Sequence, residues 1–481
     1  MRLSALAGTA PPGDDPDILG LTADSRAVKP GYLFAALPGV KADGASFVAD
    51  AVARGAVALL GVESLRAHSL GRPLIAVNNP RQRLATLAAT FYARQPATIV
   101  AVTGTNGKTS VASFVRQIWS ALGHRSASFG TVGVVSPSGT RPLSHTTPDP
   151  VEIHRLLADL VDEGVDSTAF EASSHGLAQF RVDGVKLRAA GFTNLTRDHL
   201  DYHETFEAYQ NAKLRLFTEV LPSTGVAIIN SDSPSAQLFE QAAQQRGQSL
   251  IRVGEGAADL GLMSRIPVGD GQDLVVSWQG HRYELRLPLA GAFQASNVLI
   301  AAGLVLGTGG KAEKVFAALA NLQGAAGRLE KIGISGHAVP VYVDYAHTPD
   351  ALETVLKALR PHTQGQLWVV FGCGGDRDAG KRPLMGMAAR DFADRVIVTD
   401  DNPRTEDAAL IRQAVRQAVP LAMEISDRSA AIETAISSAA KGDVVVIAGK
   451  GHETGQIVGR EVRPFNDADE VRAVISKSRK A

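Results

Sequence analysis

The sequence lacks the features that mark secreted, membrane-spanning or strongly charged proteins. Its single cysteine, Cys373, makes an intrachain disulfide impossible, in agreement with a reducing compartment. Basic and acidic side chains are balanced at 49 each, so the net charge draws the chain neither to nucleic acid nor to a membrane. The longest apolar run, Val298–Leu306, is too short and too interrupted by glycine to cross a bilayer. The first fifteen residues contain no basic region followed by an apolar core, and we expect a cytoplasmic protein without a signal peptide.

Length and patterning predict an α/β protein of three domains, because 481 residues exceed one ordinary core. A small α/β domain is expected at residues 1–95, where apolar runs and helical stretches alternate until Gln95-Pro96 breaks the pattern. A central domain with a parallel or mixed sheet of the P-loop ATPase type is expected at 96–326, with strand-helix alternation up to the small residues 323–327. Regular alternation over 327–481 predicts a Rossmann-like parallel sheet with helices on both faces. Ligands are expected in the clefts between these domains.

A phosphate-binding loop is the most specific signal of the central segment. The sequence TIVAVTGTNGKTS at 98–110 predicts a buried strand, a glycine-rich turn and the start of a helix. Backbone N–H groups of such a turn face an anion, while Lys108 reaches the β- and γ-phosphates and Thr109 places its hydroxyl on Mg²⁺. Val102 stands where the common P-loop has its first glycine, so only G-T-N-G-K-T matches. The alternative is an ordinary helix N-terminus capped by the loop's own side chains. The residues predicted to bind the nucleotide here are Gly104, Thr105, Asn106, Gly107, Lys108, Thr109 and Ser110.

Two further side chains of the central segment stand out by their positions. Glu171 ends the apolar strand Ser167–Phe170, where a carboxylate faces the ligand crevice of a parallel sheet. Beside a phosphate loop this favours Mg²⁺ coordination, although most such residues are solvated strand ends. Lys213 falls on the apolar stripe of a helix predicted over 204–220. A lysine there either snorkels to water or loses its charge by burial, and the spacing alone favours snorkelling.

A series of sequence blocks, in one order over nearly the whole chain, resembles the Mur ligases and the related folylpolyglutamate synthases. Besides the phosphate loop, the blocks are TTPDP (146–150), EASSHGL (171–177), FTNLTRDHLDYH (192–203), GAFQASN (291–297), GR-E (327–330), DYAHTPD (344–350), GCGGDRDAGKRPLM (372–385), DNPR (401–404) and GKGHE (449–453). Their set is most similar to the member of the Mur ligase family that adds the third amino acid of the peptide.

The resemblance implies an ATP-dependent amide ligase of peptidoglycan synthesis. The D-glutamate γ-carboxylate of UDP-N-acetylmuramoyl-L-alanyl-D-glutamate would attack the ATP γ-phosphate, and the amine of meso-diaminopimelate would attack the acyl phosphate. Residues 1–95 would bind the UDP-substrate, 96–326 ATP and 327–481 the amino acid. Mg²⁺ is expected as cofactor, with a monomeric protein and no nucleic-acid or membrane partner. The alternatives are an L-lysine-adding relative, a folylpolyglutamate-type ligase and a nucleotide-dependent switch without ligation.

The resemblance also implies a magnesium site formed by Thr109, Glu171, His199 and Lys213. Lys213 would be N-carboxylated, and a carbamate requires the neutral amine that burial favours. Histidine is an unusual ligand for hard Mg²⁺, and the alternative for His199 is a hydrogen-bonded turn histidine.

Further contacts are implied for the nucleotide and for the UDP-substrate. The additional nucleotide residues are Asn297, Arg328 and Asp344, with His347 nearby. Domain closure would bring Arg328 to the phosphates and exclude water, whereas its alternative role is an interdomain salt bridge. In the first domain, the segments 22–26 and 39–44 resemble uridine-binding loops. The residues implied for the UDP-substrate are Ser25, Thr146, Thr147, Ser173, Gln179 and Arg181.

The DNPR block is expected to determine the amino-acid substrate. Diaminopimelate carries a distal carboxylate, which suits the planar fork of arginine, and a distal ammonium, which suits a carboxylate such as Glu453. By resemblance, Arg404 marks enzymes that use diaminopimelate, and lysine-adding relatives lack it. Asn-Pro is also a plain turn signal. The residues implied for this ligand are Arg377, Asp401, Asn402, Pro403, Arg404, Gly449 and Glu453.

Overall fold

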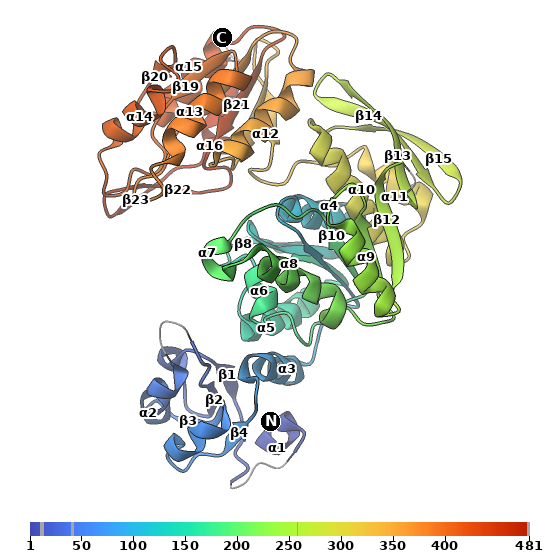
Figure 1. Ribbon diagram of the computed structural model, residues 1–481, viewed down its shortest axis with the longest axis vertical. Helices are drawn as coiled ribbons and strands as arrows, with labels where there is room; N and C mark the ends of the chain where they lie inside the picture. The colour runs from blue at the N-terminus through green and yellow to red at the C-terminus, as the bar shows by residue number, and fades with distance from the viewer. Residues whose placement is uncertain (10–13, 40–42, 257, 479–481) are drawn as a thin grey trace. The chain divides into compact units, whose positions relative to one another are not determined.

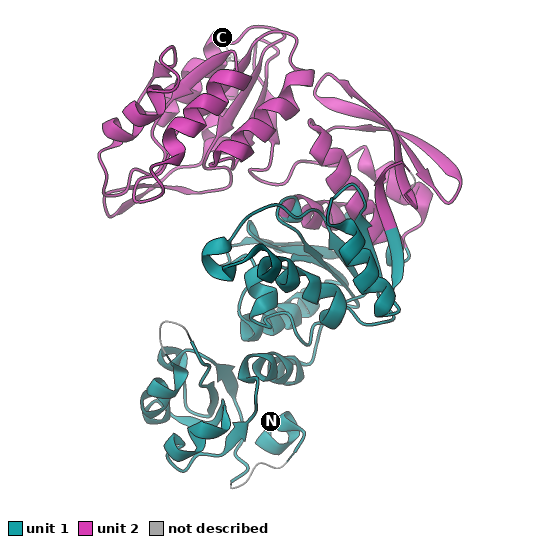
Figure 2. Cartoon of the chain, in the orientation of Figure 1, with its two compact units in different colours: residues 1–108, 119–251, 307–309 teal, residues 109–118, 252–306, 310–481 magenta. Residues whose placement is uncertain are grey.

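The structure, a computed structural model, describes residues 1–9, 14–39, 43–256 and 258–478. Within these residues the chain folds into two compact units (Figure 2). Unit 1 contains residues 1–108, 119–251 and 307–309, and unit 2 contains 109–118, 252–306 and 310–481. The predicted uridine-binding loop 39–44 lies partly outside the described residues, at 40–42. Among the described residues, no helix has the length and apolar character that a membrane span requires.

The N-terminal part of unit 1 is a small parallel sheet covered by helices (Figure 1). Its four strands pair in sequence order, and each pair is parallel. Apolar residues fill both faces of this sheet. The strands are β1 (Gly20–Thr22), β2 (Tyr32–Ala35), β3 (Ala56–Gly61) and β4 (Leu74–Ala76), and the helices are α1 (Leu3–Ala7), η1 (Ser25–Ala27), η2 (Gly44–Phe47), α2 (Val48–Ala53), η3 (Glu63–His68) and α3 (Pro80–Tyr92).

The rest of unit 1 is built around the buried strand β5 (Thr98–Thr103), which pairs in parallel with β9 (Ser167–Glu171) and β10 (Ala189–Phe192). The order within unit 1 is β11-β10-β5-β9-β6-β7-β8. Since the three central strands are parallel, the loops that follow them meet at one edge of the sheet. The other strands are β6 (Ser126–Gly130), β7 (Gly133–Ser136), β8 (Gly139–Arg141) and β11 (Val226–Asn230). The helices are α4 (Lys108–Ala121), which continues into unit 2, α5 (Pro150–Asp162), α6 (Ser174–Ala178), α7 (Leu200–His203), α8 (Phe206–Arg215), the π-helical turn η4 (Leu216–Val220) and α9 (Ala236–Gln245).

Residues 260–287 form an antiparallel meander, and the prediction that strand-helix alternation continues through this region was wrong. The strands β13 (Leu260–Val268), β14 (Gly271–Trp278) and β15 (His281–Leu287) follow β12 (Ser249–Glu255) and pair as successive hairpins. Two short turns explain the difference, because Gly269 and Gly280 both have positive φ and reverse the chain without a helix. The helices α10 (Ala292–Gly307) and α11 (Ala312–Leu319) follow, and α10 buries the long apolar run.

The C-terminal part of unit 2 is a six-stranded sheet in the order β16-β17-β21-β18-β19-β20. Helices cover both faces, as predicted, because two separate apolar clusters form on its two sides. The sheet is not wholly parallel, since the edge strand β16 pairs antiparallel with β17. The strands are β16 (Glu330–Ile334), β17 (Pro340–Asp344), β18 (Leu367–Phe371), β19 (Arg395–Val398), β20 (Met423–Glu424) and β21 (Val444–Ala448), followed by the hairpin β22 (Gly455–Val458) and β23 (Glu461–Pro464). The helices are α12 (Pro349–Leu359), η5 (Arg360–His362), α13 (Lys381–Phe392), α14 (Ala408–Arg416), α15 (Arg428–Ser438) and α16 (Asp467–Ser478).

Candidate functional site

The predicted phosphate loop follows β5 and is braced by the chain that leaves β10. Gly104 has φ 146°, and a Cβ there would lie 1.9 Å from Thr193 Oγ1, so only glycine fits. The Thr105 N–H donates to the Asn194 carbonyl at 2.8 Å, and the Asn106 N–H donates to Asn194 Oδ1 at 3.0 Å. The loop is therefore held in one conformation by side chains and backbone of the FTNLT block. Thr109 and Ser110, which follow in α4, are both buried.

Two lysines converge on one carbonyl oxygen of this loop. Lys108 Nζ donates to Gly104 O at 2.9 Å and to Thr105 O at 2.8 Å, and Lys213 Nζ donates to the same Gly104 O at 2.7 Å. Lys213 is 1% exposed and its Nζ lies 4.6 Å from the centre of the Tyr209 ring, so it does not snorkel to water. Burial, and then the charge of Lys108, hold the pKa of Lys213 well below its usual value. These surroundings favour the neutral form of the amine, which a carbamate requires.

Glu171 is buried at the end of β9 and is not a solvated strand end. Its Oε1 accepts a hydrogen bond from the Thr131 N–H at 2.7 Å, and its Oε2 accepts one from the Thr131 hydroxyl at 3.2 Å. Gly130 makes room for it, because a Cβ there would lie 2.1 Å from Glu171 Oε1. His199 precedes α7 with φ 51°, and its Nε2 lies 3.6 Å from Asp198 Oδ2.

The donor chemistry fits Mg²⁺ shared with a nucleotide. No group of three histidine, cysteine, aspartate or glutamate side chains forms a ready metal site in the described part of the chain. Mg²⁺ needs no such cage, because it is usually held by one or two carboxylates together with phosphate oxygens and water. Glu171 offers a carboxylate, Thr109 a hydroxyl, and a carbamate on Lys213 would add two oxygens.

The residues predicted for the muramyl-peptide form one network in unit 1. Thr147 Oγ1 donates to the Glu171 carbonyl at 2.8 Å and accepts from the Ser173 N–H at 3.0 Å. Arg181 donates to the Thr147 carbonyl at 2.7 Å, and its Nη2 donates to Gln179 Oε1 at 2.8 Å. Thr146 lies nearby, with its hydroxyl 3.0 Å from that of Thr131. Ser25 is separate from this network and lies in η1, beside the N-terminal sheet.

In unit 2, three of the predicted nucleotide residues, Arg328, Asp344 and His347, lie at or near the end of β17. Asp344 Oδ2 accepts from the Leu329 N–H at 2.6 Å and Oδ1 accepts from the Ala346 N–H at 2.7 Å. Burial raises the pKa of Asp344 to about 6, although the Arg328 charge opposes the shift. Arg328 lies over the Tyr345 ring, and its buried Nε has no hydrogen-bond partner among the residues that the structure describes. Asn297 donates to Gln294 Oε1 at 3.3 Å, and His347 Nδ1 lies 2.9 Å from the Tyr345 carbonyl.

The DNPR loop is fixed by the turns around it. The Gly375 N–H donates to the Asn402 carbonyl at 2.9 Å, and a Cβ on Gly375 would lie 2.0 Å from the Pro403 carbonyl oxygen. Arg404 has φ 53°, and its Nη1 donates to the Gly375 carbonyl at 2.7 Å. Asn402 Nδ2 donates to Glu453 Oε2 at 2.9 Å, which ties this loop to the GKGHE turn.

Gly449, another of the predicted residues, adjoins this loop. A Cβ on Gly449 would lie 2.8 Å from Asp401 Oδ2, so glycine allows the GKGHE turn to approach the DNPR loop. The Gly449 N–H also donates to the Asp344 carbonyl at 3.1 Å, which joins the residues predicted for the amino acid to those predicted for the nucleotide in unit 2. Arg377 is exposed in the turn between β18 and α13.

Sequence reasoning missed several side chains that hold this site together. Thr193 and Asn194 brace the phosphate loop, Thr131 holds Glu171, and Lys450 donates a hydrogen bond to Asn402 of the DNPR loop. Thr193, Asn194 and Lys450 lie in sequence blocks that were recognised. A block alone, however, does not show which of its residues are buried against a neighbouring segment. Thr131 lies in no block and gave no signal.

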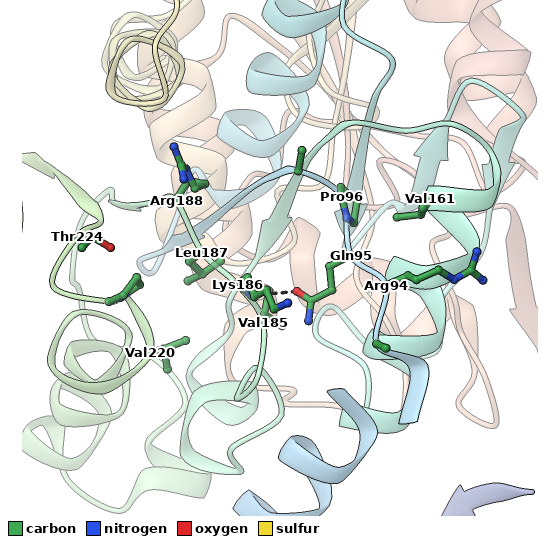
Figure 3. Close-up of a pocket in the computed structure, with 13 residues that line it drawn as sticks. Arg94, Gln95, Pro96, Val161, Val185, Lys186, Leu187, Arg188, Val220 and Thr224 are labelled. Carbon is green, nitrogen blue, oxygen red and sulfur yellow. Dashed lines mark hydrogen bonds between the residues drawn. The ribbon is translucent and has the colours of Figure 1, made fainter. Parts of the chain in front are cut away.

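A cavity of about 700 Å³ lies apart from these residues, beside the segment Arg94–Ala97 in unit 1 (Figure 3). Gln95 is one of its lining residues, and it accepts from the Lys186 N–H at 3.0 Å and donates to the Gly184 carbonyl at 2.9 Å. None of the predicted site residues lines this cavity.

Comparison with known proteins gives the chain its family. Three successive segments match Mur ligase descriptions: "Mur ligase family, catalytic domain" at 17–92, "Mur ligase middle domain" at 102–305 and "Mur ligase, glutamate ligase domain" at 327–451. The chain belongs to the Mur ligase family. It is similar to the UDP-N-acetylmuramoyl-L-alanyl-D-glutamate–2,6-diaminopimelate ligase of Caulobacter vibrioides, with 54% identity over 98% of this chain and 97% of the relative. The ligase of the same name from Bradyrhizobium diazoefficiens is 53% identical over 96% and 95% of the two chains. A solved structure of a ligase of that name has a TM-score of 0.77, 35% identity and 99% coverage of both chains.

Proposed function

We propose that this chain is the ATP-dependent ligase that joins meso-diaminopimelate to the D-glutamate γ-carboxylate of UDP-N-acetylmuramoyl-L-alanyl-D-glutamate in peptidoglycan synthesis. Relatives with the corresponding name align over nearly the whole of both chains. One observation supports the amino-acid substrate most directly: Asn402 is hydrogen-bonded to both the Arg404 guanidinium and the Glu453 carboxylate. A fixed cation and a fixed anion at one loop suit the distal carboxylate and ammonium of diaminopimelate.

The phosphate loop would carry the activation step. An oxygen of the D-glutamate γ-carboxylate bonds to the γ-phosphorus of ATP, and ADP leaves. Lys108, held over the loop carbonyls, would donate to the phosphoryl oxygens as their charge develops. Mg²⁺, when bound, would neutralise further negative charge, and Thr109, Glu171, His199 and the carbamate of Lys213 would hold it.

The role proposed for Lys213 follows from its surroundings. Its amine nitrogen bonds to the carbon of CO₂ and loses one proton, which turns a neutral amine into an anion. That anion would lie beside the Lys108 ammonium, and the two charges would stabilise each other. An ammonium at Lys213 would instead repel Lys108 from inside a buried site.

The amide bond would form on the acyl phosphate. The free amine of diaminopimelate attacks the acyl carbon, loses a proton, and inorganic phosphate leaves. No side-chain nucleophile is needed. Arg328 has a buried Nε without a hydrogen-bond partner among the described residues, which suits a phosphate oxygen of the nucleotide. Asp344 accepts a hydrogen bond from the N–H of the next residue, Leu329. The proposal includes a cytoplasmic monomer with domain boundaries near residues 95 and 326.

Two rival activities would differ from the proposed ligase in the substrates that they require for the release of ADP. A folylpolyglutamate-type ligase would use glutamate and a folate, and a nucleotide-dependent switch would release ADP without any amino acid. The test is ADP release with ATP, Mg²⁺ and UDP-N-acetylmuramoyl-L-alanyl-D-glutamate, with meso-diaminopimelate, L-lysine or no amino acid added. A parallel reaction contains glutamate and tetrahydrofolate. We expect sustained release only with diaminopimelate, and sustained release in the amino-acid-free or the folate reaction would reject the proposal.

A further inference from the structure

Lys450 is a lysine with no exposed surface in the turn that follows β21. Its Nζ donates to Asn402 Oδ1 at 3.0 Å and to Glu453 Oε2 at 2.9 Å. The turn reaches this position through two glycines, since Gly449 has φ 117° and Gly451 has φ 54°. A buried ammonium is costly unless it is paired and hydrogen-bonded, and both of its partners belong to the proposed amino-acid site.

The contacts of Lys450 determine how the Asn402 amide is oriented. Asn402 Oδ1 also accepts from the Ile457 N–H at 2.9 Å. An ammonium and a backbone N–H can only donate, so both must face the amide oxygen. The NH₂ group of Asn402 is therefore left to face Glu453, to which it donates at 2.9 Å.

The contact with Lys450 also favours the ionised form of the Glu453 carboxyl. Burial alone raises the pKa of the Glu453 carboxyl, but Lys450 and the Asn402 amide outweigh it and leave the pKa below its usual value. Both hydrogen bonds fall on Oε2, and about a third of the Glu453 side chain is exposed (34%). Oε1 takes neither of these two hydrogen bonds and is left for a ligand ammonium.

We propose that Lys450 is a positioning residue for the amino-acid substrate: it fixes the orientation of the Asn402 amide and of the Glu453 carboxylate, which then receives an ammonium group. Lys450 does not touch the substrate. The inference rests on the proposed function, in which that ammonium is the distal one of diaminopimelate. If Lys450 served only the fold, its replacement would lower the stability of the protein. It would not change how the KM for diaminopimelate depends on pH.

The test replaces the charge by a side chain of similar length, Lys450→Met, with the exposed Lys441→Met as control. In Lys450→Met, we expect the KM for meso-diaminopimelate to rise at least about tenfold, while the KM for ATP stays at the wild-type value. The melting temperature of the Lys441→Met control should equal that of wild type. Without Lys450, burial raises the pKa of Glu453, so the KM for diaminopimelate should also climb as pH falls from 9 towards 6. Wild type should show a flatter profile.

A double-mutant cycle with Glu453→Gln separates positioning from packing. If Lys450 acts through Glu453, Lys450→Met should add little to the KM of a Glu453→Gln enzyme. Independent, multiplying effects, or a folded Lys450→Met enzyme with an unchanged KM and pH profile, would overturn the inference. If Lys450→Met does not fold, Lys450→Arg is tested instead, because it keeps the positive charge. We then expect a raised KM for diaminopimelate with a wild-type pH profile. An unchanged KM would count against the inference. If wild type does not consume diaminopimelate at all, the proposed function fails, and this is seen before any variant is made.

Discussion

Lys213, Asp344 and Lys450 are ionisable side chains that the fold keeps away from water. Because burial disfavours the charged forms of such side chains, each requires hydrogen bonds or charges around it that offset this cost. Lys450 has two hydrogen-bond partners, and Asp344 accepts two backbone N–H groups. Lys213 has the Gly104 carbonyl and a like charge nearby, which favours the neutral amine. Its burial therefore accords with a modification that needs that neutral form.

Replacing Lys213 by alanine should abolish ligation without unfolding the protein. The variant cannot form a carbamate, and we expect the rate of product formation to fall by about 10³-fold or more. Far-ultraviolet circular dichroism and the melting temperature report folding, and Lys314→Ala, an exposed lysine of α11, is the matched control. Near wild-type activity of the Lys213→Ala enzyme would show that ligation does not need a carbamate on Lys213.

Replacing Arg404 by alanine should damage the use of diaminopimelate far more than the use of ATP. The distal carboxylate would lose a charge-assisted, bidentate partner, which costs roughly 2–5 kcal/mol in kcat/KM when the pair is desolvated. The exposed Arg463→Ala on β23 is the control. A variant that keeps the wild-type preference for diaminopimelate over L-lysine would show that Arg404 does not discriminate.

At the scale of elements, the strands and helices around the site followed from apolar patterning, but their pairing did not. The helix predicted over 204–220 is α8 followed by a π-helical turn, and it changes at Arg215, a buried arginine paired with Asp183 through 2.8 and 2.7 Å hydrogen bonds. This partner lies 32 residues away and no local pattern reveals it. The antiparallel pairing of β16 likewise depends on a neighbour, β17, whose direction the residues of β16 do not encode.

The turn after β5 should tolerate no side chain at its first glycine. In Gly104→Ala, the Cβ would collide with Thr193 Oγ1 at a φ that alanine avoids, so the loop must move. We expect nucleotide affinity to fall by about tenfold or more, measured by calorimetric titration with ADP. Gly123→Ala controls for the backbone strain, because Gly123 has φ 93° but open space around it. Equal losses in the two variants would contradict this explanation of the loop.

The turn after β17 should make stability depend on pH. The folded pKa of Asp344, about 6, exceeds the ordinary 3.8, so the folded protein binds more protons between these values. Stability is therefore fully present below pH 4 and falls as pH rises through 6, by about 3 kcal/mol for this group. Urea unfolding of wild type and Asp344→Ala from pH 4 to 7.5 should show the gap between them shrinking as pH rises. Parallel curves would mean that the Asp344 carboxyl is ionised in the folded protein at low pH.

At the scale of the whole molecule, the order of blocks along the chain predicted the family, and the family descriptions confirm it. The α/β fold predicted with it is confirmed by the observed sheets and helices. The residues proposed for each ligand remain predictions, but those of the muramyl-peptide network and of the DNPR loop are brought together by hydrogen bonds. The sequence could not reveal supporting residues such as Thr131 and Lys450, because their importance lies in burial and contacts across the fold.

The mass of the product shows which amino acid the enzyme joins to the UDP-substrate. The enzyme is incubated with ATP, Mg²⁺ and UDP-N-acetylmuramoyl-L-alanyl-D-glutamate, together with equal concentrations of meso-diaminopimelate and L-lysine. L-Lysine lacks the distal carboxylate and would leave Arg404 unpaired, and a site that requires a substrate group rejects analogues without it by about 10⁴-fold. We predict that the mass spectrum contains the UDP-substrate joined to diaminopimelate, with no lysine product. A lysine product of equal or greater abundance would contradict the assignment of diaminopimelate and favour a lysine-adding ligase of the same family.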